Sequence, residues 1–252
     1  MLKNKVAVVL GCSAENGSGW AIAEALADAG ARVVVAARSE GSLARLADKI
    51  GGTAVRCDAG NPDDIKNLAE RAVEAYGGID IAVNAAGLPI TQSISECSED
   101  QVQQALNVNY LANVNFIKYM AADMRDGGSI ILISSSSASQ PIGDYFPYAC
   151  AKAASDCLVK YAAIEYGKRG IRVNSVLPGP IKTDLAHQLF AQEGMEEAFA
   201  REIPLGRVGL PKDYADVVLW LSGPAFVTGL NLPVSGGNHL TRAPRPDELP
   251  LP

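Results

Sequence analysis

The stretch VAVVLGCSAENGSGWAIAEALADAG, residues 6–30, joins an apolar run, a glycine-rich turn and an amphipathic segment. Residues 6–10 are apolar throughout, which is typical of a strand buried on both faces of a parallel sheet. Ile22, Leu26 and Ala29 then follow at helical spacing until Gly30 ends the pattern. Glycines between a first strand and a helix let the backbone approach a pyrophosphate at the helix N-terminus. The stretch therefore predicts a nucleotide-binding unit.

The same alternation continues along the chain. Helical patterns separate six further short runs rich in β-branched residues, at 32–37, 53–57, 80–85, 129–134, 172–177 and 231–236. Alternating strands and helices predict an α/β protein with a doubly wound Rossmann fold, in which a seven-stranded parallel sheet carries helices on both faces. We expect residues 1–252 to form a single domain. The proline-rich segment 238–252 should be an extended C-terminal tail, either loose or draped on a neighbouring subunit.

Composition narrows the class of protein. Hydrophobic residues make up 48% of the 252 residues, and 22 basic against 28 acidic residues give a net charge of −6. An acidic chain without basic clusters argues against nucleic acid or an anionic membrane as partner. No apolar run approaches the ~20 residues of a membrane span, and the N-terminus does not resemble a signal peptide. We therefore expect a cytoplasmic protein.

Cysteine and histidine usage agrees with that location. The five cysteines form no CxxC pair, and their odd number fits a reducing compartment. Cys150 and Cys157 lie too far apart on one predicted helix to form a disulfide. With only two histidines and no clustered ligands, we expect no metal site.

The glycine turn and its position resemble the short-chain dehydrogenase/reductase family. That family's usual turn reads G-x-x-x-G-x-G, whereas five residues separate Gly11 from Gly17 here, so the loop is two residues longer. The longer form, together with Trp20, is similar to the branch that contains enoyl thioester reductases. The resemblance implies phosphate contacts from Gly11, Ser13, Gly17, Ser18 and Gly19.

The end of the second strand bears on the choice of cofactor. An acidic residue there would accept hydrogen bonds from a ribose 2′-hydroxyl and repel a 2′-phosphate. This chain instead has Ala37 followed by Arg38, whose guanidinium forks onto phosphate oxygens. We expect NADP(H) to be preferred, with NAD(H) as the alternative cofactor. The resemblance further implies that Asp58 contacts the adenine ring and that Asn84 and Gly87, in VNAAG, lie beside the ribose.

The segment PYACAKAA contains a candidate acid–base pair. Lys152 follows Tyr148 by four residues, so both side chains lie on one face of the predicted helix. A nearby ammonium favours the phenolate and lowers the tyrosine pKa, which suits proton transfer to a carbonyl oxygen. Ser135 ends an apolar strand 13 residues before Tyr148, the spacing of the family's serine and tyrosine. There it would stabilise the substrate oxygen as charge develops.

Further residues enter through the resemblance. Asn109 matches the asparagine that holds a water near the lysine, whereas Asn113 has the pattern of a surface residue. Residues about 183–205 resemble the variable substrate lid, whose apolar side chains indicate an apolar substrate. The nicotinamide carboxamide would be bound by Pro178, Gly179, Ile181 and Thr183. The cofactor would also contact Tyr148 and Lys152. The substrate pocket would be lined by Tyr145, Leu189 and Phe190.

These residues predict an oxidoreductase that transfers a hydride between NADP(H) and a ketone or secondary alcohol, with Tyr148 as general acid/base and Asn109, Ser135 and Lys152 completing the catalytic set. The alternatives are a 3-oxoacyl thioester reductase and an enoyl thioester reductase. The longer glycine loop and the spacing of Tyr145 to Lys152 favour the enoyl thioester reductase. A non-catalytic NADP(H)-binding sensor is the alternative from a different class. The resemblance also implies a small-molecule carbonyl or alcohol substrate and a homotetramer or homodimer.

Overall fold

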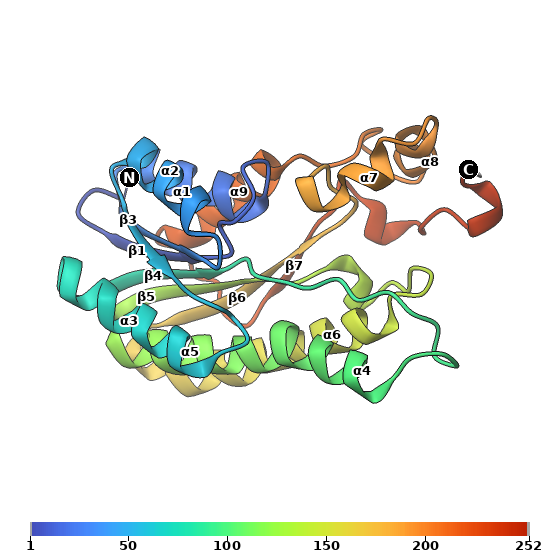
Figure 1. Ribbon diagram of the computed structural model, residues 1–252. Coiled ribbons are helices and arrows are strands. Elements are labelled where there is room, and N and C mark those ends of the chain that lie inside the picture. The colour runs from blue at the N-terminus through green and yellow to red at the C-terminus, as the bar shows by residue number, and fades with distance from the viewer. Residues whose placement is uncertain (1, 251–252) are drawn as a thin grey trace.

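A computed structural model of the protein describes residues 2–250, without the side chains of Leu185 and Pro246. Its strands form one parallel sheet in the order β3-β2-β1-β4-β5-β6-β7, shown edge-on in Figure 1. The predicted seven-stranded fold is thus confirmed. The strands are β1 (Val6–Leu10), β2 (Arg32–Ala37), β3 (Thr53–Arg56), β4 (Ile79–Asn84), β5 (Met124–Ile133), β6 (Arg172–Pro178) and β7 (Asn231–Val234).

The helices cover both faces of this sheet (Figure 1). One face carries α1 (Ser18–Asp28), α2 (Glu40–Ile50) and α9 (Pro211–Ser222). The other carries α3 (Pro62–Tyr76), α4 (Glu99–Leu106), α5 (Ala112–Asp123) and α6 (Phe146–Tyr166). A π-helical turn, Asn107–Leu111, joins α4 to α5. None of the helices described between residues 2 and 250 is long and apolar enough to cross a membrane.

Two hydrophobic cores follow from the alternation of side chains along each strand. In β1, Val8 and Leu10 belong to the core beneath α3, α5 and α6, whereas Ala7 and Val9 belong to the core beneath α1, α2 and α9. Because both faces of β1 are buried, its five residues are all apolar.

The strand order places a binding crevice beside β1 and β4. Successive strands run outward from β1 through β2 to β3, and then return to β4 on the opposite side. The loops after β1 and β4 therefore leave toward opposite faces and open a crevice at the carboxyl ends of the strands.

The lid and the tail pack together beside this crevice. The lid contains α7 (His187–Phe190) and α8 (Met195–Arg201), and the chain's last described residues lie next to them in Figure 1. Asn238 Nδ2 donates to the Glu202 carbonyl at 3.1 Å, and Arg242 forms an ion pair with the Glu202 carboxylate at 2.9 Å. Two 3₁₀ turns interrupt the tail. The prediction of an extended tail is therefore wrong for residues 238–250, which pack on the lid of their own chain. Residues 251–252 lie outside the described part.

Candidate active site

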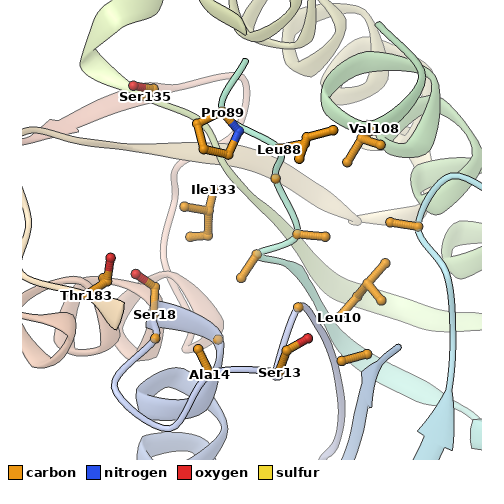
Figure 2. A pocket seen from close by; sticks show the side chains of 18 of the residues that line it. Leu10, Ser13, Ala14, Ser18, Leu88, Pro89, Val108, Ile133, Ser135 and Thr183 are labelled. Atoms are coloured by element: carbon orange, nitrogen blue, oxygen red, sulfur yellow. The ribbon is translucent and has the colours of Figure 1, made fainter. Parts of the chain in front are cut away.

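A cavity of about 400 Å³ opens at the carboxyl ends of the strands. Figure 2 shows Ser13 and Ser18 of the glycine loop on one side of it and Leu88 and Pro89, which follow β4, on the other. The cavity therefore occupies the crevice that the strand order creates.

The glycine loop approaches the neighbouring backbone so closely that side chains are excluded. A Cβ on Gly11 would lie 2.5 Å from the carbonyl carbon of Ala85, and one on Gly19 would lie 2.4 Å from the Gly11 carbonyl oxygen. The next helix, α1, begins at Ser18 with no acidic residue in its first turn, so its free N–H groups suit an anion. This cradle fits the pyrophosphate of a nicotinamide dinucleotide. Every loop residue predicted to contact phosphate lines the cavity: Gly11, Ser13, Gly17, Ser18 and Gly19.

The predicted adenosine and nicotinamide contacts lie at the same cavity. Arg38, Asp58 and Gly87 line it, and so do Pro178, Gly179, Ile181 and Thr183. The Asp58 carboxylate also accepts a hydrogen bond from the backbone N–H of Gly60 at 2.9 Å, which shapes the turn after β3.

Asn84, which we predicted to lie beside the ribose, makes its side-chain hydrogen bonds within the protein. Its side chain is buried, donates from Nδ2 to Asn113 Oδ1 at 2.8 Å and accepts from the Ala86 N–H at 3.0 Å. Asn84 is not among the residues that line the cavity. Its hydrogen bond with the Ala86 N–H instead holds the loop after β4, and Gly87 of that loop lines the cavity.

Asn113 is buried, so the prediction that it lies on the surface is wrong. Its Nδ2 donates to Ser155 Oγ and to the Asn109 carbonyl, both at 2.9 Å. The π-helical turn before it inserts one residue into the helical path, which rotates the following residues relative to a continuous α-helix. The sequence shows no signal for that insertion.

Asn109 holds the loop after β4 with its side chain. Its Oδ1 accepts from the Leu88 N–H at 3.0 Å, and its Nδ2 donates to the Leu88 and Ala105 carbonyls at 2.9 and 3.0 Å. Its backbone carbonyl accepts hydrogen bonds from both Asn113 and Ser155. Asn109 therefore ties Leu88 to the helix against which Lys152 lies.

Tyr148 and Lys152 lie on the same face of α6 and line the cavity together. Pro147 stands in the first turn of the helix, as predicted, so Tyr148 belongs to regular helix. Lys152 Nζ lies 5.5 Å from the centre of the Tyr148 ring and donates to the Ile133 carbonyl at 2.8 Å. The ammonium group is thus fixed beneath the phenol.

The two groups have strongly altered proton affinities. Burial raises the pKa of the Tyr148 phenol to about 12, and a hydrogen bond with Ser135 acts in the opposite direction. Burial lowers the pKa of the Lys152 ammonium to about 8, which the negative charge of Asp156 opposes. Tyr148 therefore carries a proton at neutral pH, and the nearby ammonium lowers the free-energy cost of releasing it.

Ser135 lines the cavity from the loop after β5. Its Oγ lies 2.9 Å from Ser137 Oγ and accepts from the Ser137 N–H at 3.2 Å. These contacts orient the hydroxyl next to Tyr148. Ser135, Tyr148 and Lys152 thus come together at one place, from the end of β5 and the start of α6.

Asp156 is a residue near the site that we did not predict from the sequence. It lies one helical turn beyond Lys152, and its Oδ1 accepts from Ser175 Oγ at 3.4 Å. Burial raises the pKa of its carboxyl, while the charge of Lys152 lowers it. Its spacing of four residues from Lys152 was the signal that could have identified it.

None of the predicted substrate-pocket residues is among the described residues that line the cavity. The Tyr145 ring centre is 6.3 Å from that of Tyr148, with the two rings edge to face. Leu189 and Phe190 pack into a small core within the lid, where the Phe190 and Phe199 rings lie 5.6 Å apart. The apolar pattern of the lid therefore accounts for packing inside the lid itself.

Comparison with known proteins identifies the family. A family model described as Enoyl-(Acyl carrier protein) reductase matches residues 11–239. The human dehydrogenase/reductase SDR family member 4 is 35% identical over 246 residues, which cover 94% of this chain and 88% of the human protein. The chain belongs to the short-chain dehydrogenase/reductase (SDR) family.

Two further similar proteins bear on the reaction. The 3-oxoacyl-[acyl-carrier-protein] reductase of Vibrio cholerae is 32% identical, over 95% of this chain and 99% of that protein. A variant of actinorhodin polyketide ketoreductase, solved with NADPH, superimposes with a TM-score of 0.87 at 29% identity, over 95% of this chain and 99% of that one. As an SDR protein, the chain is an NAD(P)(H)-binding oxidoreductase that acts on CH–OH or carbonyl groups of small molecules.

Proposed function

We propose that the protein transfers a hydride between NADP(H) and an apolar ketone or secondary alcohol, with Tyr148 as the general acid/base. The observation that carries this proposal is the position of the buried Lys152 ammonium, 5.5 Å from the Tyr148 ring, at a cavity shared with the glycine loop.

The chain's own residues account for the movement of the proton. A bound reduced nicotinamide would supply the hydride that carbonyl reduction requires. Ser135 would donate a hydrogen bond to the substrate oxygen and stabilise the charge that develops there. Tyr148 would donate its phenolic proton to that oxygen, and the Lys152 ammonium would stabilise the phenolate that remains. Asn109 would act by fixing the Leu88 backbone beside them.

Charge within the cavity supports both the cofactor and the substrate class. Among the described residues that line it, the charged side chains are Arg38, Asp58 and Lys152. Arg38 follows Ala37, so the site offers a cation and no carboxylate where a 2′-phosphate would lie, which favours NADP(H) over NAD(H). Since the three charged groups are assigned to cofactor and catalysis, none remains for a charged group on the substrate.

A 3-oxoacyl thioester reductase is the second candidate, because the Vibrio cholerae relative carries that name and the chemistry at the carbonyl is the same. Enoyl thioester reduction would use Tyr145 in place of Tyr148. The ring of Tyr148 lies next to Lys152, whereas Tyr145 precedes the regular part of α6, which favours the ketone reaction. A non-catalytic NADP(H) sensor would have no need for Ser135, Tyr148 and Lys152 to meet at the cavity.

We also propose a homotetramer or homodimer of single-domain subunits. Leu111, Tyr161 and Ile164 are large apolar side chains exposed on the α5–α6 side, and Trp220 and Phe226 are exposed near the end of α9. Association of identical subunits would cover such residues. For location, we propose the cytoplasm, which the five free cysteines support.

The decisive experiment follows NADPH oxidation with a panel of ketones, 3-oxoacyl thioesters and enoyl thioesters. We expect ketone turnover that Tyr148→Phe abolishes while NADPH binding is retained, and that Tyr145→Phe leaves measurable. Preference for 3-oxoacyl thioesters would select the second candidate. Enoyl turnover that depends on Tyr145 would refute the assignment of Tyr148, and a cellular function unchanged in Tyr148→Phe would favour the sensor.

A further inference from the structure

The lengthened glycine loop contacts the lid directly. The Asn16 backbone N–H donates to Asp184 Oδ2 at 3.3 Å, and Asn16 Nδ2 donates to Asp184 Oδ1 at 3.0 Å. Both oxygens of one carboxylate are thus engaged by one residue, although 168 positions separate the two in sequence. Asn16 lies in the part of the loop that is two residues longer than the family's usual form.

These two hydrogen bonds join the glycine loop to the start of the lid beside the cavity. Gly17 and Ser18 directly follow Asn16, Thr183 directly precedes Asp184, and all three line the cavity. Figure 2 shows the Ser18 and Thr183 side chains at the same part of the cavity. Thr183 also caps the 3₁₀ turn with which the lid begins, since its Oγ1 accepts from the Ala186 N–H at 3.4 Å. Movement of the lid away from the glycine loop would therefore break the contacts of Asn16 with Asp184.

We propose that Asn16 and Asp184 are positioning residues that form a clasp between the glycine loop and the lid, and that this clasp slows the release of the bound nicotinamide nucleotide. Two additional residues lengthen a chain by up to ~7 Å, which gives the longer loop a reach that the usual loop lacks. The inference rests on the proposed binding of NADP(H) at this cavity, but not on the substrate or on Tyr148.

Electrostatic repulsion by the Asp184 carboxylate and the clasp with Asn16 predict opposite effects of removing Asp184 on the rate of nucleotide release. The nucleotide is an anion, so loss of a nearby carboxylate would by itself strengthen its binding and slow its release. Loss of the clasp would speed release. Asp184→Ala therefore separates the two explanations by the sign of the change.

The test measures NADPH release in stopped flow, through energy transfer from Trp20, which is buried in α1 directly after the loop. We expect release to be about threefold to tenfold faster in Asp184→Ala, the range for one or two exposed hydrogen bonds to a charged group. Asn16→Ala should have a smaller effect, because the backbone N–H still contacts Asp184. The double variant should release NADPH no faster than Asp184→Ala. The matched control is Glu15→Ala, which removes an exposed carboxylate from the same loop and should leave release unchanged or slower.

A reciprocal exchange provides a rescue. Asn16→Asp places two carboxylates opposite each other and should release NADPH fastest, whereas adding Asp184→Asn restores a carboxylate–amide pair and should return release close to the wild-type rate. Unchanged or slower release in Asp184→Ala, or additive effects in the Asn16→Ala and Asp184→Ala double variant, would overturn the clasp. If wild-type protein binds NADH alone, the same measurement is made with NADH. Failure to bind either nucleotide would instead overturn the proposed function together with the clasp.

Discussion

Replacement of Lys152 by methionine should make the protein more stable while it removes activity. Burial lowers the pKa of this lysine from 10.5 to about 8. At about 1.4 kcal/mol for each tenfold change in proton affinity, this costs the folded protein roughly 3 kcal/mol at neutral pH. Methionine fills similar space without a charge, but it leaves the Ile133 carbonyl without its partner, at a cost of about 1 kcal/mol. We therefore expect a gain of about 2 kcal/mol in the free energy of unfolding at pH 7.

The pH dependence gives this prediction a second, independent measurement. Below pH 8 both folded and unfolded wild-type protein carry the ammonium, so the whole penalty applies. Between pH 8 and 10.5 the folded state loses the proton while the unfolded state keeps it, so wild-type stability rises relative to the variant. Urea unfolding of both proteins at matched concentration should show the advantage of Lys152→Met shrinking above pH 8 and disappearing at about pH 9.5, with the variant about 1 kcal/mol less stable than wild type near pH 10.5.

Exposed Lys160, in the same helix, provides the control. Lys160→Met should change the free energy of unfolding by less than about 0.5 kcal/mol. The reasoning about Lys152 would be refuted if Lys152→Met were less stable than wild type at pH 7, or if the difference between them did not vary with pH.

Three further predictions concern the cofactor site and its support. Arg38→Ala should raise the KM for NADPH about tenfold and leave that for NADH unchanged, since it removes the proposed contact with the 2′-phosphate; equal effects on both would contradict the assignment. Gly19→Ala places a Cβ 2.4 Å from the Gly11 carbonyl oxygen and should weaken NADPH binding more than tenfold in a fluorescence titration, whereas Gly41→Ala, where a Cβ meets nothing within 4 Å, should bind normally. Asn113→Ala should lower the free energy of unfolding by about 2–4 kcal/mol, because it leaves buried partners unsatisfied; a loss below 1 kcal/mol in chemical denaturation would show that the network adds little.

Features that depend on residues close together in the sequence could be predicted from it. The apolar run of β1 and the glycine turn located the cavity, because close approach of a backbone requires glycine wherever it occurs. Helical spacing alone placed Tyr148 and Lys152 on one face of α6. The strand ranges were also close to those observed, although β5 begins at Met124, five residues before its predicted start.

The resemblance to a family supplied positions for other residues, but not the direction of their side chains. Gly87 and Arg38 line the cavity as expected, whereas Asn84 turns toward Asn113. A backbone motif such as the glycine loop can be located from its amino-acid sequence. The partner of a polar side chain depends on which segments pack against it.

The sequence by itself determined the order of strands and helices, the glycine cradle and the Tyr148–Lys152 pair, because each rests on local periodicity or on the geometry of a few consecutive residues. Only the tertiary structure decided that Asn113 is buried, that Asp156 acts on Lys152 within a buried site, and that Asn16 meets Asp184. The burial of Asn113, Lys152 and Asp156 and the contact of Asn16 with Asp184 depend on segments far apart in the chain, which no local pattern of residues contains.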